Sequence, residues 1–278
     1  MKIYITGATG FVGSNLVNFY ADKHDVHEHN RHNPVGMILN IAKPDVIINC
    51  GAEIYNDRDM ISPNLGMLNE CLEYVRDNPK TRMVHIGSSS EYGPKDRPSK
   101  ETDMPNPVDM YQATKAAGTL LCQGYARQYD LDISIARPYS VYGPGERPHR
   151  LFPRLWKAFA YDEPMTLHHG YHDFIYIDDF VRGIDTLVRK RNKPRGDIVN
   201  FGSGKQYSNL EVLQTFEKIT GKKAPVEVVD TMAKSFESNV WVCDTTYAKT
   251  EYGFGVRYDL ESGIKKFLSE AYYEQEKS

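Results

Sequence analysis

A tyrosine and a lysine four residues apart are the first residues of this chain whose types and spacing could carry out chemistry. Tyr111 and Lys115 lie in the stretch DMYQATKAAG (109–118), which is typical of a helix start. Side chains four positions apart are neighbours on a helix surface, so the ammonium of Lys115 can reach the phenol or whatever the phenol touches. The same spacing occurs by chance in solvated helices, so its meaning depends on what surrounds it.

A glycine-rich turn near the start of the chain predicts a dinucleotide site. In YITGATGFVGSNL, Gly7, Gly10 and Gly13 stand between a predicted strand and a predicted helix. Glycines allow a tight turn and close backbone approach, and the free N–H groups of the helix start favour a diphosphate. The spacing is G-x-x-G-x-x-G, which differs from the commoner G-x-G-x-x-G. We predict contacts with the cofactor from these glycines and from Thr9, Phe11 and Val12.

The second predicted strand bears on which dinucleotide is bound. An NAD-selective site usually places an acidic residue there to bond the ribose 2′-hydroxyl. This chain has Asn30 and Arg31 at the end of DVHEHNR, and an arginine can make a forked contact with a 2′-phosphate. These residues favour NADP(H). NAD(H) is the alternative, because Glu28 would take the acidic role if the strand register differed by a little.

Three serines emerge where the nicotinamide ring should lie. Ser88, Ser89 and Ser90 follow the predicted strand RMVHIG. A hydroxyl there can bond a substrate hydroxyl while Tyr111 exchanges its proton, and Lys115 with the positive nicotinamide would lower the phenol pKa from about 10 toward the working pH. The group predicts a dehydrogenation in which a carbinol proton leaves as its hydride moves to the cofactor.

Short β-branched segments alternate with amphipathic ones as far as Gly145, which predicts an α/β fold with a Rossmann-type, doubly wound parallel sheet. The pattern loosens after that point and is broken by Pro148, Pro153, Pro164 and Pro194. We expect residues 1–145 to form the dinucleotide-binding domain. Residues 146–278 would form mainly a smaller substrate-binding lobe, with some segments returning to the first domain.

Composition excludes several classes of protein. The net charge of −3 does not indicate the basic surface that nucleic-acid binding requires. No apolar run is long enough for a membrane helix. The first residues lack a secretory signal, so we expect a cytoplasmic protein. Four scattered cysteines and the histidines of HDVHEHNRH and HHGYH show no metal-ligand spacing, so we predict no metal site.

Taken together, the motifs TGATGFVG, the serine-rich strand end with EYG, YQATK, RPYSVYGPG and DFIYIDD resemble the extended short-chain dehydrogenase/reductase family, in its nucleotide-sugar epimerase/dehydratase branch. The resemblance runs in the family's order over nearly the whole chain. It implies Tyr111 as base, Lys115 as cofactor anchor and Ser88, four residues before the tyrosine of EYG, as the catalytic hydroxyl.

The resemblance also implies further contacts with cofactor and substrate. Cofactor contacts would come from Asn49, Gly51, Ala52, Pro138, Ser140 and Val141, in addition to Asn30 and Arg31. Substrate contacts are expected from Ser89, Ser90, Arg150, Arg154 and His172, while Arg137 and Arg147 are further candidates for the diphosphate. The family generally forms homodimers through two long helices of each subunit, one of which would carry Tyr111.

Three departures from the family pattern bear on function. The segment between Asn30 and Pro44 is too short for the strand that usually follows and ends in an Asp-hydrophobic pair holding adenine. Ser90 stands where related dehydratases have Glu, although a one-residue slip would bring Glu91 there. Ser140 and His172 stand where many relatives have Asn and Arg.

The sequence favours a nucleotide-sugar epimerase that transiently oxidises a ring hydroxyl of a nucleoside-diphosphate sugar. The main alternative is an NADPH-dependent 4-keto-deoxysugar-nucleotide reductase, which would use Ser88, Tyr111 and Lys115 in the same way. A dehydratase or decarboxylase depends on Glu91, and a non-catalytic dinucleotide sensor would have little use for the three residues together.

Overall fold

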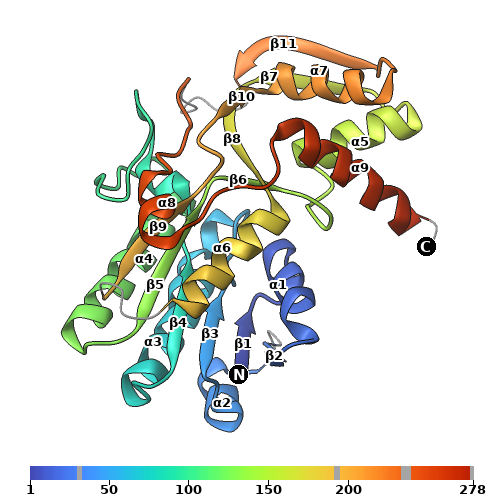
Figure 1. Cartoon of the computed structure of the whole chain (residues 1–278). Helices are drawn as coiled ribbons and strands as arrows, with labels where there is room; N and C mark the ends of the chain where they lie inside the picture. Colours follow the sequence, from blue (N-terminus) through green and yellow to red (C-terminus); the bar gives the residue numbers. More distant parts are fainter. Residues whose placement is uncertain (30–32, 191–194, 233–238, 276–278) are drawn as a thin grey trace.

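A computed structural model describes residues 1–29, 33–190, 195–232 and 239–275 (Figure 1). Its main feature is a six-stranded parallel sheet in the order β2-β1-β3-β4-β5-β9. The strands are β1 (Lys2–Thr6), β2 (Asp25–Glu28), β3 (Val46–Asn49), β4 (Arg82–Ile86), β5 (Ile133–Pro138) and β9 (Asp197–Phe201). This confirms the predicted Rossmann-type α/β fold.

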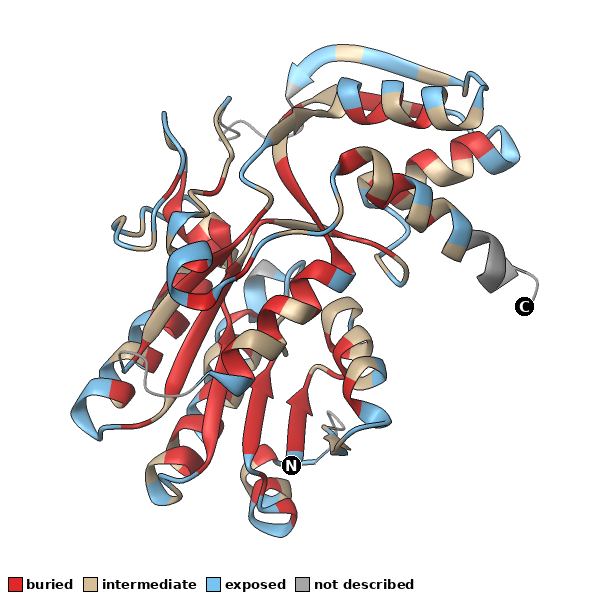
Figure 2. Cartoon of the chain, viewed as in Figure 1, coloured by how far each residue is buried: buried red, intermediate tan, exposed pale blue. Residues whose placement is uncertain are grey.

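Helices cover both faces of this sheet because its central strands, such as β3 and β4, are buried on both sides (Figure 2). The apolar residues of one face pack with α2 (Val35–Ala42), α3 (Met67–Asp77) and α4 (Met110–Gln128). Those of the other face pack with α1 (Phe11–Ala21) and α6 (Ile177–Arg189). A π-helical turn, η2 (Ser62–Gly66), leads into α3, and short 3-10 turns, η1 (Asp57–Asp59) and η3 (Ser89–Tyr92), follow β3 and β4.

The sheet ends at β2. The usual doubly wound order has a further strand outside the second one. Here α2 lies within the link that follows β2, and β3 begins at Val46. As the short segment predicts, the described part of this link contains no additional strand.

Further elements gather beyond the carboxyl ends of the large sheet (Figure 1). They are α5 (Leu151–Tyr161), β7 (Met165–His169), α7 (Asn209–Thr220), β11 (Val226–Met232) and α9 (Leu260–Gln275). A small sheet of β6 (Ser140–Tyr142), β8 (Tyr171–Tyr176) and β10 (Gln206–Ser208) connects them to the large sheet. Three elements from the second half of the chain, α6, β9 and α8 (Thr246–Tyr252), return to the large sheet.

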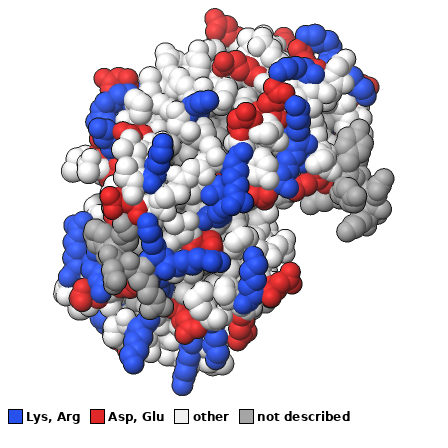
Figure 3. Space-filling view, in the orientation of Figure 1, with Lys and Arg blue, Asp and Glu red and all other residues white. Residues whose placement is uncertain are grey.

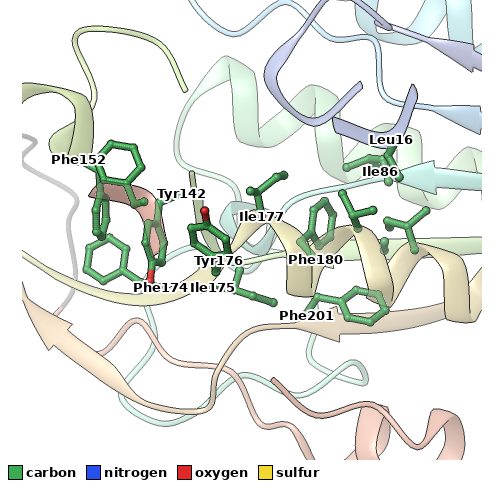
Figure 4. Packing of buried hydrophobic residues seen from close by; sticks show 14 of the residues in the cluster. Leu16, Ile86, Tyr142, Phe152, Phe174, Ile175, Tyr176, Ile177, Phe180 and Phe201 are labelled. Carbon is green, nitrogen blue, oxygen red and sulfur yellow. The ribbon is translucent and has the colours of Figure 1, made fainter. Parts of the chain in front are cut away.

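An aromatic cluster holds these outer elements together (Figure 4). The ring of Phe152 is 1% exposed and stacks on Tyr142 with centroids 3.9 Å apart. Phe174 meets both rings edge-on, at 5.2 Å from Phe152 and 6.2 Å from Tyr142. Phe216 and Phe267 bring α7 and α9 onto the same ring. One apolar core therefore fixes α5, β6, β8, α7 and α9 relative to one another.

Charged side chains of both signs occur on the surface. Basic and acidic side chains both occur over the upper and lower parts of the face in Figure 3. No helix in the described part of the chain combines the length and apolar character needed to cross a bilayer. Among the described residues, no three His, Cys, Asp or Glu side chains gather as a metal site requires.

Candidate active site

The glycine-rich turn joins β1 to α1 and comes close to the end of β3. Gly7 has a φ of +63°, and a Cβ there would lie 2.8 Å from the backbone of Gly51. A Cβ on Gly13 would lie 2.1 Å from the carbonyl oxygen of Gly7. Both positions therefore require glycine. The first turn of α1 carries no acidic residue, so its N–H groups remain suited to an anion.

Other predicted cofactor contacts surround this turn. Thr9 is exposed, while Phe11, Val12 and Ala52 are half-buried at the heads of α1 and of the loop after β3. Pro138, Ser140 and Val141 are half-buried where β5 passes into β6. Asn30 and Arg31 lie outside the described residues.

The side chain of Asn49 is hydrogen-bonded to other residues of the protein. It is 1% exposed, its Oδ1 accepts from the Thr6 hydroxyl at 2.6 Å, and its Nδ2 lies 3.0 Å from Nδ1 of His85. The Thr6 hydroxyl also accepts from the backbone N–H of Gly51 at 3.1 Å. Asn49 therefore shapes the floor beneath the turn, and the sequence alone did not predict these partners.

The three serines form a turn at the end of β4. Ser88 is the N-cap of η3, and its Oγ lies 2.6 Å from Oγ of Ser90. Ser88 and Ser89 are buried, with 9% and 6% of their surface exposed, whereas Ser90 is half-buried. The geometry thus places two hydroxyls side by side at the strand end.

Tyr111 and Lys115 lie in the first turns of α4, whose N-cap is Asp109. The Asp109 carboxylate accepts from the backbone N–H of Gln112 at 2.8 Å, so the helix begins at a fixed residue. Burial raises the pKa of Tyr111, while a hydrogen bond with Ser88 and the charge of Arg150 lower it. The structure therefore brings the phenol to the predicted serine.

Lys115 is 5% exposed and donates to the carbonyl oxygen of Ile86 at 2.6 Å. Burial lowers the pKa of Lys115, and the charge of Glu91 raises it. The ammonium thus sits at the end of β4, beside the strand that leads to Ser88. Its contact with a main-chain carbonyl was not predicted, because sequence spacing does not show which strand a helix covers.

Glu91 and Arg137 are buried in the core. The Glu91 side chain is 0% exposed and forms an ion pair with Arg137, whose side chain is 1% exposed, at 2.7 Å. This geometry gives no support to the alternative that Glu91 occupies the acid position of a dehydratase. The guanidinium of Arg137, suggested as a diphosphate partner, is buried against Glu91.

Three of the predicted site residues lie near one another and near Tyr111. Oγ of Ser140 lies 3.3 Å from Nδ1 of His172, and burial lowers the pKa of His172 to about 4. Arg150, at the head of α5, lies 3.3 Å from Glu146 and is the charge that acts on both Tyr111 and His172. These residues meet although they are far apart in the sequence.

Two other residues modify this picture. Arg154 donates to the carbonyl oxygen of Thr166 at 3.0 Å, so its guanidinium is tied to β7. Glu146 was not predicted as part of the site. Burial raises the pKa of Glu146 to about 7. The sequence feature that could have indicated this residue is its position four residues before Arg150.

Comparison with known proteins assigns the family. The model of the NAD dependent epimerase/dehydratase family matches residues 3–202. The chain belongs to this family. The resemblance to extended short-chain dehydrogenases/reductases is thereby confirmed.

Individual relatives are spread over several sugar-nucleotide enzymes. An uncharacterized UDP-glucose epimerase of Bacillus subtilis is 27% identical over 322 residues, which cover 98% of this chain and 99% of that protein. The UDP-glucuronate 4-epimerase of Thermodesulfobacterium geofontis is 31% identical over 210 residues, 73% of this chain and 63% of that one. A dTDP-glucose 4,6-dehydratase of Streptomyces griseus is 26% identical, with 86% of this chain and 74% of that one covered.

A solved structure matches the chain along its full length. It is the UDP-glucuronic acid 4-epimerase from Bacillus cereus in complex with UDP-glucuronic acid and NAD, with a TM-score of 0.86, 26% identity and 99% of each chain covered.

Proposed function

We propose that this protein is a nucleotide-sugar epimerase that oxidises a ring hydroxyl of a nucleoside-diphosphate sugar transiently and reduces the resulting ketone from the other face. The observation that carries the proposal is the meeting of Ser88, Tyr111 and Lys115 at the end of β4, beside the glycine-rich turn. The UDP-sugar epimerases among the relatives support it.

The chain's own residues would move one proton. The Ser88 hydroxyl holds the sugar hydroxyl, and the Tyr111 phenolate takes its proton and later returns it. The bound nicotinamide cofactor supplies a site that accepts a hydride and gives it back. Lys115, buried one helical turn from Tyr111, would favour the phenolate by its charge.

The residues present fit a dinucleotide. The turn at Gly7 and Gly13 has no room for side chains, and the start of α1 is free of negative charge, as a bound diphosphate requires. The NADP(H) preference from Asn30 and Arg31 gains no support from the relatives, since the solved epimerase contains NAD. We propose NAD(H), because an epimerase returns its hydride and needs no external reductant.

On the substrate side, we propose that Arg150 binds the diphosphate, with Ser140 and His172 beside it. Arg150 is exposed and already acts on the phenol and the imidazole. His172, with a pKa of about 4, is neutral near pH 7 and offers a hydrogen bond without charge. Arg154 would serve mainly to hold β7.

The competing activities differ in what they require. The dehydratase alternative depends on an acid that faces the sugar, whereas the Glu91 carboxylate is buried and paired with Arg137. The reductase uses the same three residues and differs in consuming NADPH.

Incubation of the purified protein with UDP-glucose and UDP-glucuronate, with NAD or NADPH present, tests the proposal. Formation of the 4-epimer without net change in the cofactor is expected. Stoichiometric loss of NADPH absorbance on a 4-keto sugar nucleotide would instead identify a reductase. Loss of water from the sugar would identify a dehydratase, and no reaction with any of them would favour a sensor.

We also propose that the protein forms a homodimer through α4. A shallow hollow on this helix is lined by Ala117, Leu120, Leu121, Gly124 and Tyr125, among others. Leu120 is 57% exposed and Leu121 is 37% exposed, which is unusual for two adjacent leucines of a helix. A second copy of the same helix would cover them.

A further inference from the structure

A buried ion pair lies directly beneath the catalytic serine. Oε2 of Glu91 accepts from Nη2 of Arg137 at 2.7 Å and from Nε at 2.9 Å. Replacing such a buried pair by apolar side chains of similar volume is often neutral or stabilising, so the pair is weak evidence for a role in stability. Its position therefore calls for another explanation.

The second oxygen of the same carboxylate holds the backbone of Ser88. Oε1 of Glu91 accepts from the Ser88 N–H at 2.7 Å, which completes a capping box with the Ser88 side chain. A Cβ on Gly87 would lie 2.5 Å from this oxygen, so the carboxylate packs against the strand end itself. The N–H of Ser88 thus points to a fixed acceptor in the core.

Arg137 is itself held from two sides. Its guanidinium lies over the ring of Tyr92 at 4.5 Å, and the Tyr92 hydroxyl donates to Oδ1 of Asn200 at 2.8 Å. Arg137 belongs to β5 and Asn200 to β9, so Glu91 connects the Ser88 backbone to the next two strands of the sheet. Through these contacts the sheet restrains the position of Ser88, which lies on a short turn.

We propose that Glu91 is a positioning residue that fixes the Ser88 hydroxyl for proton exchange with Tyr111. The inference rests on the proposed function, in which Ser88 holds the sugar hydroxyl. A small displacement of a reacting group costs rate more than binding, so the loss should appear in kcat and little in KM.

Two double variants isolate the hydrogen bond between the Ser88 N–H and the Glu91 side chain. Glu91→Gln with Arg137→Met removes both charges but keeps an oxygen that can accept from the Ser88 N–H. Glu91→Leu with Arg137→Met removes the acceptor as well, at nearly the same volume. We expect the Leu variant to have a kcat about tenfold below that of the Gln variant, with KM values within about threefold. The reaction is the one that the unaltered protein carries out on UDP-glucose or UDP-glucuronate.

The same pair in a Ser88→Ala background separates positioning from general damage. If Glu91 acts through Ser88, the two variants should then have equal kcat values. Equal values in the presence of Ser88, or a tenfold ratio that persists without its hydroxyl, would overturn the proposal.

Amide hydrogen exchange of the unaltered protein gives a readout that needs neither turnover nor stable variants. The Ser88 amide should exchange about 100-fold or more slowly than the amides of exposed loops, because its acceptor is buried. Exchange at the rate of exposed loops would overturn the proposal even if no sugar nucleotide reacted. Absence of turnover with a protected Ser88 amide would count against the proposed function alone.

Discussion

Replacement of Asp173 by asparagine should destabilise the protein strongly. Asp173 is 0% exposed at the start of β8 and accepts four hydrogen bonds. Oδ1 accepts from the N–H and the hydroxyl of Ser203, each at 2.6 Å. Oδ2 accepts from the N–H of Gly204 at 2.9 Å and of Cys243 at 3.0 Å. The carboxylate thus joins β8 to the turn after β9 and to the segment before α8.

The magnitude follows from the loss of one acceptor. An asparagine whose NH₂ group replaces Oδ2 leaves the N–H groups of Gly204 and Cys243 without an acceptor. With the NH₂ group in place of Oδ1, only the N–H of Ser203 loses its acceptor, because the Ser203 hydroxyl also bonds the carbonyl oxygen of Lys205. The second orientation costs less, and one unsatisfied buried donor costs about 1–3 kcal/mol, so the free energy of unfolding should fall by about 2 kcal/mol. For a chain of this size about 1 kcal/mol corresponds to about 2–4 °C, so Tm should fall by about 4–8 °C.

Thermal unfolding followed by circular dichroism measures this effect. Because burial raises the pKa of Asp173 to about 6, the comparison belongs at a pH of about 8, where the folded protein carries the carboxylate. Asp230→Asn, at an exposed position of β11, is the control and should leave Tm within about 2 °C. A Tm of the Asp173 variant within the range of this control would refute the hydrogen-bond reasoning.

Three further outcomes are expected. Tyr111→Phe should lower kcat at least about 100-fold, while NAD binding and Tm stay near those of the unaltered protein. A kcat within a few fold of that of the unaltered protein would show that Tyr111 is not the base. Glu146, with a pKa of about 7, is protonated below that pH and then no longer neutralises Arg150, so KM for a diphosphate sugar should fall as pH drops through 7. Glu146→Gln should give the low KM at every pH, and an unchanged profile would contradict this coupling. Leu120→Glu should convert the dimer into monomers, as measured by light scattering at micromolar concentration. Ile41→Glu, at a 73% exposed position of α2, is the control and should leave the dimer intact. A dimer that survives Leu120→Glu would exclude the α4 face as the interface.

The parts of the fold set by local pattern could be predicted from the sequence. The turn of Gly7 and Gly13 follows from backbone space, and the alternation of apolar strands with amphipathic helices gives the parallel sheet. Tyr111 lies near Ser88 because a helix start and a strand end meet at the same edge of such a sheet.

The parts that depend on distant partners could not be predicted. Glu91 and Arg137 are 46 residues apart, and only the 3-10 turn after β4 decides that the carboxylate points into the core. The sequence likewise offered Asn49 as a cofactor contact without showing that Thr6 and His85 would occupy its amide. In each case the order of the strands in the sheet brings a polar side chain next to a partner that is distant in the sequence.

The outer side of β2 has a consequence for protein engineering. Within the described residues this strand pairs with β1 alone, and the link from Glu28 to α2 is short. A strand-and-helix module grafted into this link could extend the sheet by one strand while every existing neighbour relation was kept. Length could therefore change at this border of the sheet, away from Ser88, Tyr111 and Lys115, but an insertion in this link would alter the predicted ribose contacts Asn30 and Arg31.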